Sequence, residues 1–154
     1  MNKEDVSDIA SILRDLLQAI AQVEYLWASL TIDMFHEHWE TSIDAGPKVD
    51  DVLQWRGECL AELLTRTLSA VAERRAPSSP GHLDERFTED LPGFLALLLE
   101  TRDAFSAFPL EIAFVPRSAV EPERPWEVAI ESEGQTVITP GQTALEALLT
   151  ALGR

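Results

Sequence analysis

Two scarcities limit what this chain of 154 residues can be. Its single cysteine, Cys59, excludes an intramolecular disulfide and any site that needs several thiolates, such as a zinc finger. Basic residues are also few: 12 lysines and arginines stand against 27 aspartates and glutamates, a net charge of −15. Nucleic acids and anionic membranes repel such a chain, so we expect it to bind neither directly. A basic protein partner is compatible with this charge.

Long apolar runs and glycine-rich loops are missing as well. No apolar stretch approaches the length of a membrane span, and residues 1–10 lack the basic start and apolar core of a signal peptide. We therefore expect a cytoplasmic protein. The glycines are isolated and no Gly-x-Ser-x-Gly occurs, so the sequence predicts neither a phosphate-binding loop nor a hydrolase nucleophile. It implies no cofactor.

An apolar stripe with steps of three and four residues begins near the N-terminus. Its members are Val6, Ile9, Leu13, Leu16, Ile20, Val23, Trp27, Leu30 and Met34. Such spacing lines one face of a helix, which predicts a long helix over 2–41. A second stripe predicts a helix over 49–75, and the turn residues between the two predict an antiparallel helical hairpin. Leu16 and Leu60 are expected to be buried inside it.

The segment 90–108 is apolar on nearly all sides, which predicts a third, buried helix. After it the pattern changes to that of strands, at 110–115, 126–131 and 136–139. We therefore predict an α+β protein with two parts. A helical domain spans 1–108, and a small β-β-β-α unit spans 109–154.

The C-terminal unit has two clear local signals. Glu133-Gly134 predicts a tight turn, and Thr143 with Glu146 forms a capping box for a final helix that ends at Gly153. The hairpin and the helix after Gly141 resemble the strand-strand-helix segment of HicB-like antitoxins. The likeness consists of the capping box and the leucines, which many small α+β units share, and it carries over no catalytic residue.

One cluster, Asp33, His36, Glu37 and Glu40, has the composition of a site. On a helix these side chains would project within about 100° of one another, and Asp33-x-x-His36 resembles a ligand pair of metal-binding helical bundles. The second helix offers no histidine, so half of such a ligand set is missing. A structural interpretation is favoured, in which Arg56 pairs with Asp33 or Glu37 across the hairpin.

We therefore predict a non-enzymatic protein that binds and masks or recruits a protein partner, as inhibitors, antitoxins and immunity proteins do. Its candidate partner-binding residues are the acidic Asp8, Asp15 and Glu24, and no catalytic residue is predicted. Two alternatives stay open: a small metal-dependent enzyme built on the cluster, and a structural homo-oligomer, in its simplest form a homodimer. Cys59 is interpreted as a small hydrophobic residue at a helix rim.

Overall fold

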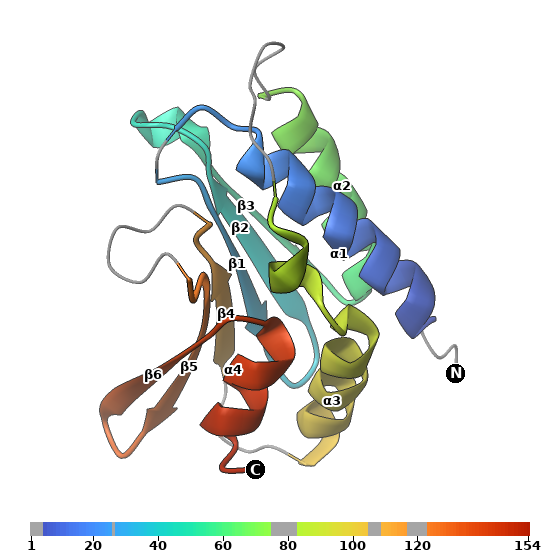
Figure 1. The fold of residues 1–154 in the computed structure, drawn as a ribbon, viewed down its shortest axis with the longest axis vertical. Helices are drawn as coiled ribbons and strands as arrows, with labels where there is room; N and C mark the ends of the chain where they lie inside the picture. The colour runs from blue at the N-terminus through green and yellow to red at the C-terminus, as the bar shows by residue number, and fades with distance from the viewer. Residues whose placement is uncertain (1–4, 26, 75–82, 105–108, 117–122) are drawn as a thin grey trace.

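A computed structural model describes residues 5–25, 27–74, 83–104, 109–116 and 123–154. Within these ranges the chain forms one six-stranded antiparallel sheet, in the spatial order β3-β2-β1-β4-β5-β6 (Figure 1). The strands are β1 Ser29–Met34, β2 Trp39–Asp44, β3 Val52–Gly57, β4 Leu110–Phe114, β5 Trp126–Ser132 and β6 Gln135–Gly141.

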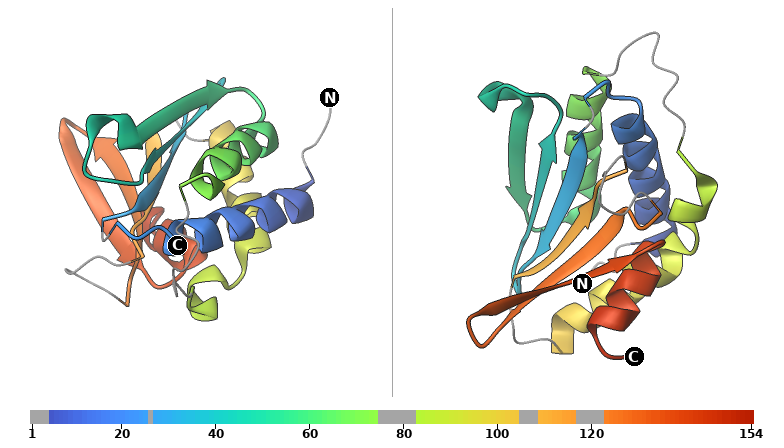
Figure 2. Two further views of the ribbon diagram at one scale, coloured as in Figure 1. Left: turned by 90° about the horizontal axis from the view of Figure 1, so that it is seen from above. Right: turned by 60° about the vertical axis from the view of Figure 1, so that its left-hand side comes forward.

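The α-helices of the described chain all cover the same face of this sheet (Figures 1 and 2). They are α1 Val6–Ala21, α2 Leu60–Ala72, α3 Leu91–Ala104 and α4 Ala144–Ala151, with short 3₁₀ turns η1 Val49–Asp51 and η2 Glu85–Thr88. Helix α2 packs on β2 and β3, α4 packs on β5 and β6, and α1 and α3 lie between them. The other face of the sheet, called the open face below, carries no helix of the described chain.

Strand residues alternate between the two faces because successive side chains of a strand point in opposite directions. In β1, Leu30, Ile32 and Met34 are buried beneath the helices, whereas Thr31 and Asp33 on the open face are only half-buried. The same alternation runs through β2 and β4. The hydrophobic core therefore lies between the sheet and the helix layer, and the open face carries mostly polar and small side chains, with Val52 and Ile138 as exposed apolar residues on its edge strands.

The predicted helical hairpin is wrong. The expected helix over 2–41 is helix α1 followed by β1 and the start of β2, and the expected helix over 49–75 is η1 and β3 followed by α2. Residues four apart lie on one face of a helix and also on one face of a strand, so Leu30 and Met34 continue the stripe in either structure. Leu16 and Leu60 are nevertheless fully buried, as predicted.

The third helix is present as α3, and the predicted C-terminal strands and helix are present as β4, β5, β6 and α4. The expectation of a small separate β-β-β-α unit is wrong, because β4 pairs with β1 and the six strands make one large sheet. Sequence patterns predict strands without predicting which strands pair, so this junction could not be seen. Residues 2–4, 26, 75 and 105–108 of the predicted helices lie outside the described residues.

The local signals near the C-terminus are confirmed. Glu133 and Gly134 form the turn between β5 and β6, with φ angles of 52° and 78°. The Thr143 hydroxyl accepts the Glu146 backbone N–H at 3.0 Å, and the Glu146 carboxylate accepts the N–H of Gln142 at 3.2 Å. These contacts fix the start of α4 against the end of β6.

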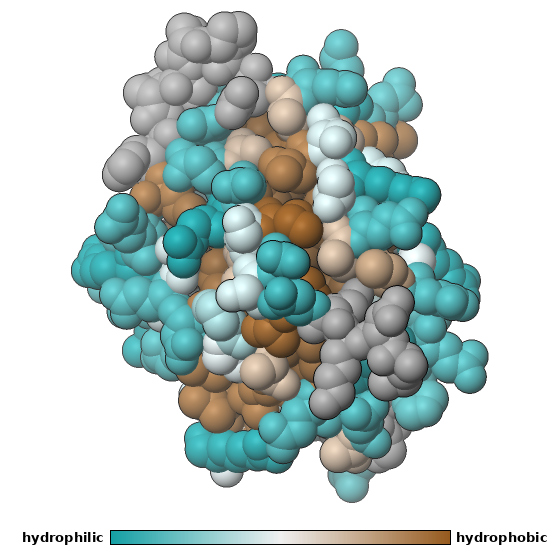
Figure 3. Space-filling view, turned by 90° about the vertical axis from the view of Figure 1, so that its right-hand side faces the viewer, coloured by the Kyte–Doolittle hydropathy of each residue, from teal (hydrophilic) through white to brown (hydrophobic). Residues whose placement is uncertain are grey.

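The helix-bearing side is not uniformly polar. Figure 3 shows a band of apolar residues down the middle of one side of the molecule, bordered by hydrophilic residues. Partly buried apolar side chains of the helices, among them Ile12, Leu68 and Leu97, pack against the core. Across the described ranges, the helices fall short of the length and apolar character that crossing a bilayer requires.

Candidate interaction surface

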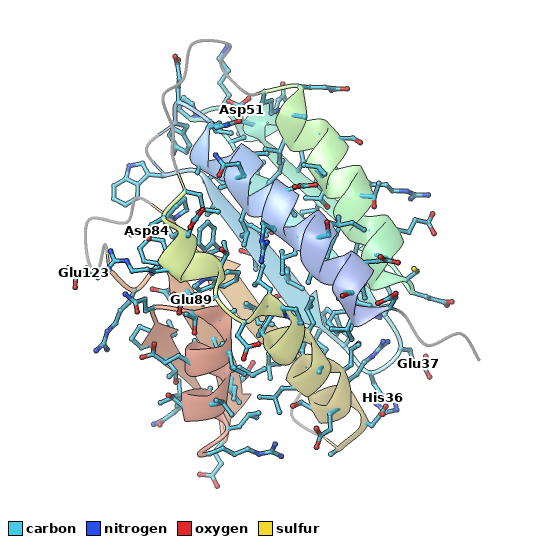
Figure 4. The ribbon with its side chains drawn as sticks, turned by 45° about the vertical axis from the view of Figure 1, so that its right-hand side comes forward. His36, Glu37, Asp51, Asp84, Glu89 and Glu123 are labelled. Atoms are coloured by element: carbon cyan, nitrogen blue, oxygen red, sulfur yellow. The ribbon has the colours of Figure 1, made fainter. Side chains whose placement is uncertain are left out.

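The structure divides the four residues of the predicted metal site between two strands and a turn. Asp33 lies near the end of β1 and Glu40 near the start of β2, directly opposite each other in the ladder. His36 and Glu37 are exposed in the turn that joins the strands (Figure 4). In the part of the chain that is described, no three His, Cys, Asp or Glu residues are arranged to hold a metal ion. The single helix face on which the metal interpretation depended does not exist.

Helix α3 holds this turn in place. The Nε of Arg102 donates to the backbone carbonyls of Phe35 and His36, each at 3.1 Å, and its guanidinium lies 4.9 Å from the ring centre of Trp39. Within the turn, the Phe35 N–H donates to the His38 carbonyl at 3.0 Å, and the rings of Phe35 and His38 stack at 4.3 Å. The end of the β1–β2 hairpin is thus fixed relative to the helix layer.

Three carboxylates of neighbouring strands stand side by side on the open face. Asp33 has Glu40 of β2 opposite it on one side and Glu111 of β4 opposite it on the other. Such directly opposed side chains have Cβ atoms about 4.5–5.5 Å apart, and like charges at this spacing are destabilising. We call Glu40, Asp33 and Glu111 the carboxylate row.

Asp33, at the centre of the row, has the most strongly perturbed carboxyl group among the described residues. Its pKa is raised from the ordinary 3.8 to about 6, first by burial and then by the charges of Glu111 and Glu40. Its Oδ1 is buried with no hydrogen-bond partner in the described chain. The nearby imidazole of His38 contacts Glu40 instead, with Nε2 3.1 Å from Oε2. Negative charge at Asp33 is therefore poorly compensated.

Arg56 was expected to pair with Asp33 or Glu37, but it lies elsewhere. It is exposed on the edge strand β3, opposite Glu40 in the β2–β3 ladder. Among the described residues no ion pair joins Arg56 to Glu40 or to Asp33, which is one strand further in. The one arginine that extends the row does not neutralise its centre.

A second group of acidic residues is paired with an arginine. Asp84, Glu89 and Glu123 lie in one region of Figure 4, around Arg86. The Arg86 guanidinium donates to the Asp84 carboxylate at 2.7 Å, and this hydrogen bond, followed by the charges of Asp84, Glu123 and Glu89, raises the Arg86 pKa. This group is paired with an arginine, whereas the one ion pair of the carboxylate row among the described residues is that of Glu40 with His38, whose imidazole is charged only if protonated.

The open face as a whole is acidic. At the strand positions that point away from the helices, its acidic residues are Asp33, Glu40, Asp44, Glu111, Glu127 and Glu131, and its basic residue is Arg56. The ladder rung next to the carboxylate row is formed by Gln54, Ser42, Thr31 and Ala113. Most of these are short side chains, so this side of the row is open, whereas the stacked rings of Phe35 and His38 border its other side.

The predicted partner-binding residues lie on a different part of the molecule. Asp8 and Asp15 are exposed on α1, seven residues apart and therefore on one side of that helix. Glu24 is exposed in the segment after α1, beside an open hollow of about 350 Å³ that Tyr25 and Arg74 also line. These three residues do not join the carboxylate row.

Sequence reasoning missed Glu111 and misplaced Cys59. Glu111 lies between Leu110 and Ile112 in a segment that was already predicted as a strand, and strand alternation is the signal that would have placed it on the outer face. What the sequence could not supply was its neighbour, because pairing of β4 with β1 is a long-range contact. Cys59, expected at the rim of an apolar stripe, is exposed and precedes the first residue of α2.

Comparison of the chain with protein-family models, with curated proteins and with solved structures gives no match.

Proposed function

We propose that this is a non-enzymatic interaction protein that captures a basic segment of a protein partner on the open face of its sheet. Binding there masks the partner's segment or recruits the partner. The observation that carries the proposal is the carboxylate row, three directly opposed acidic side chains. The central one, Asp33, has a buried oxygen with no hydrogen-bond partner among the described residues. The proposed ligand groups are lysine and arginine side chains.

Repulsion within the carboxylate row is a source of binding energy for a cation. Opposed like charges destabilise the folded chain, and a cation placed between them removes that repulsion. Binding energy is thus available at this site that a neutral sheet face would not offer. Surfaces that are kept destabilised in the free protein are typical of functional positions.

The geometry of the face favours long cationic side chains over a bulky globular surface. The neighbouring rung offers Ser42, Thr31 and Ala113, which are short enough to let a lysine or arginine reach the carboxylates. The remaining acidic residues, Asp44, Glu127 and Glu131, add to the negative potential of the face without pairing in the row. Such a potential speeds the encounter with a basic partner and is screened by salt.

The test uses two triple variants that remove the same charge. The row variant carries Asp33→Asn, Glu40→Gln and Glu111→Gln; the control carries Asp8→Asn, Asp15→Asn and Glu24→Gln. The probe is a fluorescent synthetic peptide of alternating lysine and threonine, and the measurement is its dissociation constant by anisotropy at low and high salt. Circular dichroism checks that both variants are folded.

We expect the row variant to bind at least about tenfold more weakly than the control, and the unmodified chain to bind more weakly as salt rises. Equal weakening by the two variants would mean that net charge alone attracts the peptide. Stronger weakening by the control would place the docking surface on α1, as the sequence had predicted. Either outcome would overturn the open-face proposal.

A further inference from the structure

The outer edge of the sheet at β6 is a second exposed surface. Of the two edge strands, β3 carries Arg56, whereas the seven residues of β6, Gln135–Gly141, include no charged side chain. Val137 and Ile138 are 57% and 58% exposed, and as neighbours in a strand they point to opposite faces. Soluble proteins usually protect an edge strand with charge or cover it. Within the described chain, residues 135–138 of this edge are exposed and carry no charge, and proline, which also protects edge strands, occurs in β6 only at Pro140.

The hairpin turn determines which backbone groups of β6 face outward. Ser132 pairs with Gln135 on either side of a two-residue turn, whose two residues both have positive φ. In such a hairpin the closing pair is hydrogen-bonded, and bonded and non-bonded pairs then alternate along the strands. Thr136, Ile138 and Pro140 therefore occupy non-bonded positions, and their backbone groups point away from β5. Pro140 fits this assignment because it has no N–H to lose.

We propose that a second copy of the chain occupies this edge, through antiparallel pairing of β6 with β6 of the other copy about a two-fold axis. The outward N–H and C=O groups of Ile138 would bond to the same groups of the second copy. A register centred on Ile138 keeps both sheets facing the same way, because residues at equal distance from the centre share a face. Ile138 then packs on its own counterpart, and Val137 packs beside Thr139.

Charge selects a second copy over a basic segment as the occupant. Two chains with a net charge of −15 each repel one another over most of their surfaces, and an uncharged strand is where they can approach. β6 offers no carboxylate of its own to attract a lysine or arginine, whereas its apolar side chains match themselves. In the resulting dimer the two open faces would lie on the same side of one continuous sheet.

The dimer and the proposed capture of basic segments respond to salt in opposite directions. A seven-residue edge is small beside the ~800 Å² per partner of a standard interface, so we expect a dimer that dissociates on dilution. Added salt screens the repulsion between the two acidic chains and should therefore strengthen the dimer. The same screening weakens the capture of a basic peptide. Failure of either proposal can thus be recognised separately.

The test is the molar mass in solution, measured by sedimentation velocity over a wide range of concentrations at about 0.05 and 0.5 M NaCl. Ile138→Lys places a charge on the β6 edge. Its matched control, Val52→Lys, places the same charge at a 48% exposed position on the β3 edge. A third variant, Ile138→Pro, removes one outward N–H without removing a bond to β5. Circular dichroism checks that each variant folds.

We expect a concentration-dependent dimer of the unmodified chain and of Val52→Lys, stronger at high salt, with at least about tenfold weaker association for both Ile138 variants. A monomer at every concentration and salt would overturn the proposal. Dimers unaffected by both Ile138 variants, or lost equally in Val52→Lys, would show that association uses another surface.

Discussion

Asp33 and Glu40 stand directly opposite each other in the β1–β2 ladder, two carboxylates at a position where sheets usually pair opposite charges. Glu111 of β4 closes in on Asp33 from the other side. The arrangement joins the β1–β2 hairpin to β4, which is far from it in the sequence. Repulsion among these carboxylates destabilises the free protein, and a bound cationic ligand would relieve that repulsion. The same residues therefore affect both the stability of the fold and the proposed function.

Replacement of Asp33 by asparagine should stabilise the protein at neutral pH. The folded-state pKa of about 6 lies above the ordinary 3.8, so the folded protein holds this proton more tightly than the unfolded chain. The stabilisation of the folded protein by the tightly held Asp33 proton is fully present below pH 3.8 and is lost as the pH rises through about 6. After allowance for the half-exposed site, we expect Asp33→Asn to raise the free energy of unfolding by about 1–2 kcal/mol at about pH 7.5.

Urea unfolding at several pH values measures this effect. The advantage of Asp33→Asn should shrink steadily as the pH falls toward 4. Glu131→Gln, which removes an exposed carboxylate of the open face outside the row, is the control and should change stability by less than about 0.5 kcal/mol. An equal gain for both variants, or a loss for Asp33→Asn at neutral pH, would contradict the electrostatic account of the row.

Arg102 should be important for stability because it ties α3 to the β1–β2 turn. Arg102→Ala removes two hydrogen bonds to the carbonyls of Phe35 and His36 and the contact with Trp39, so we expect a loss of about 1–3 kcal/mol in thermal or urea unfolding. Arg66→Ala is the control, since the exposed Arg66–Glu62 pair within α2 should contribute under about 0.5 kcal/mol. Similar losses for the two arginines would mean that the turn is not held by α3.

The buried hydroxyl pair Thr41–Thr67 links β2 to α2 at 2.8 Å. Thr67→Val removes one hydroxyl and leaves that of Thr41 buried without its partner, which should cost about 1–3 kcal/mol. The double variant Thr41→Val with Thr67→Val should recover part of this loss, because no buried hydroxyl is then left unpaired. A double-mutant cycle from urea unfolding measures the coupling. Additive losses would show that the two hydroxyl groups act independently.

The sequence predicts elements well where a local signal has one meaning. The tight turn at Glu133-Gly134, the capping box of Thr143 and the apolar helix α3 each depend on contacts within a few residues, and all are present. The stripe at Leu30 and Met34 has two meanings, because a spacing of four fits one face of a strand as well as of a helix. Ile32, buried between them, was the residue that distinguished the two.

The candidate surface could be predicted only in part. Asp33 and Glu40 were singled out as members of one charged cluster, yet on a helix both appeared as metal ligands, with Asp33 also a candidate partner of Arg56. On adjacent strands the same residues oppose each other, and among the described residues no ion pair is formed by Asp33. Glu111 entered the row through pairing of β1 with β4, which no local pattern encodes. The sequence therefore identified most of the charged residues of the surface, but it did not determine which strands pair and which of their residues lie opposite each other.

Mapping a basic peptide onto the folded protein by NMR tests the central proposal most directly. The ¹⁵N-labelled chain would be titrated with the lysine-threonine peptide at low salt, and amide shift changes would be followed residue by residue. We expect the largest changes in β1, β2 and β4, around Asp33, Glu40 and Glu111, with α1 little affected. Changes centred on Asp8 and Asp15, or spread evenly over the acidic surface, would contradict capture on the open face.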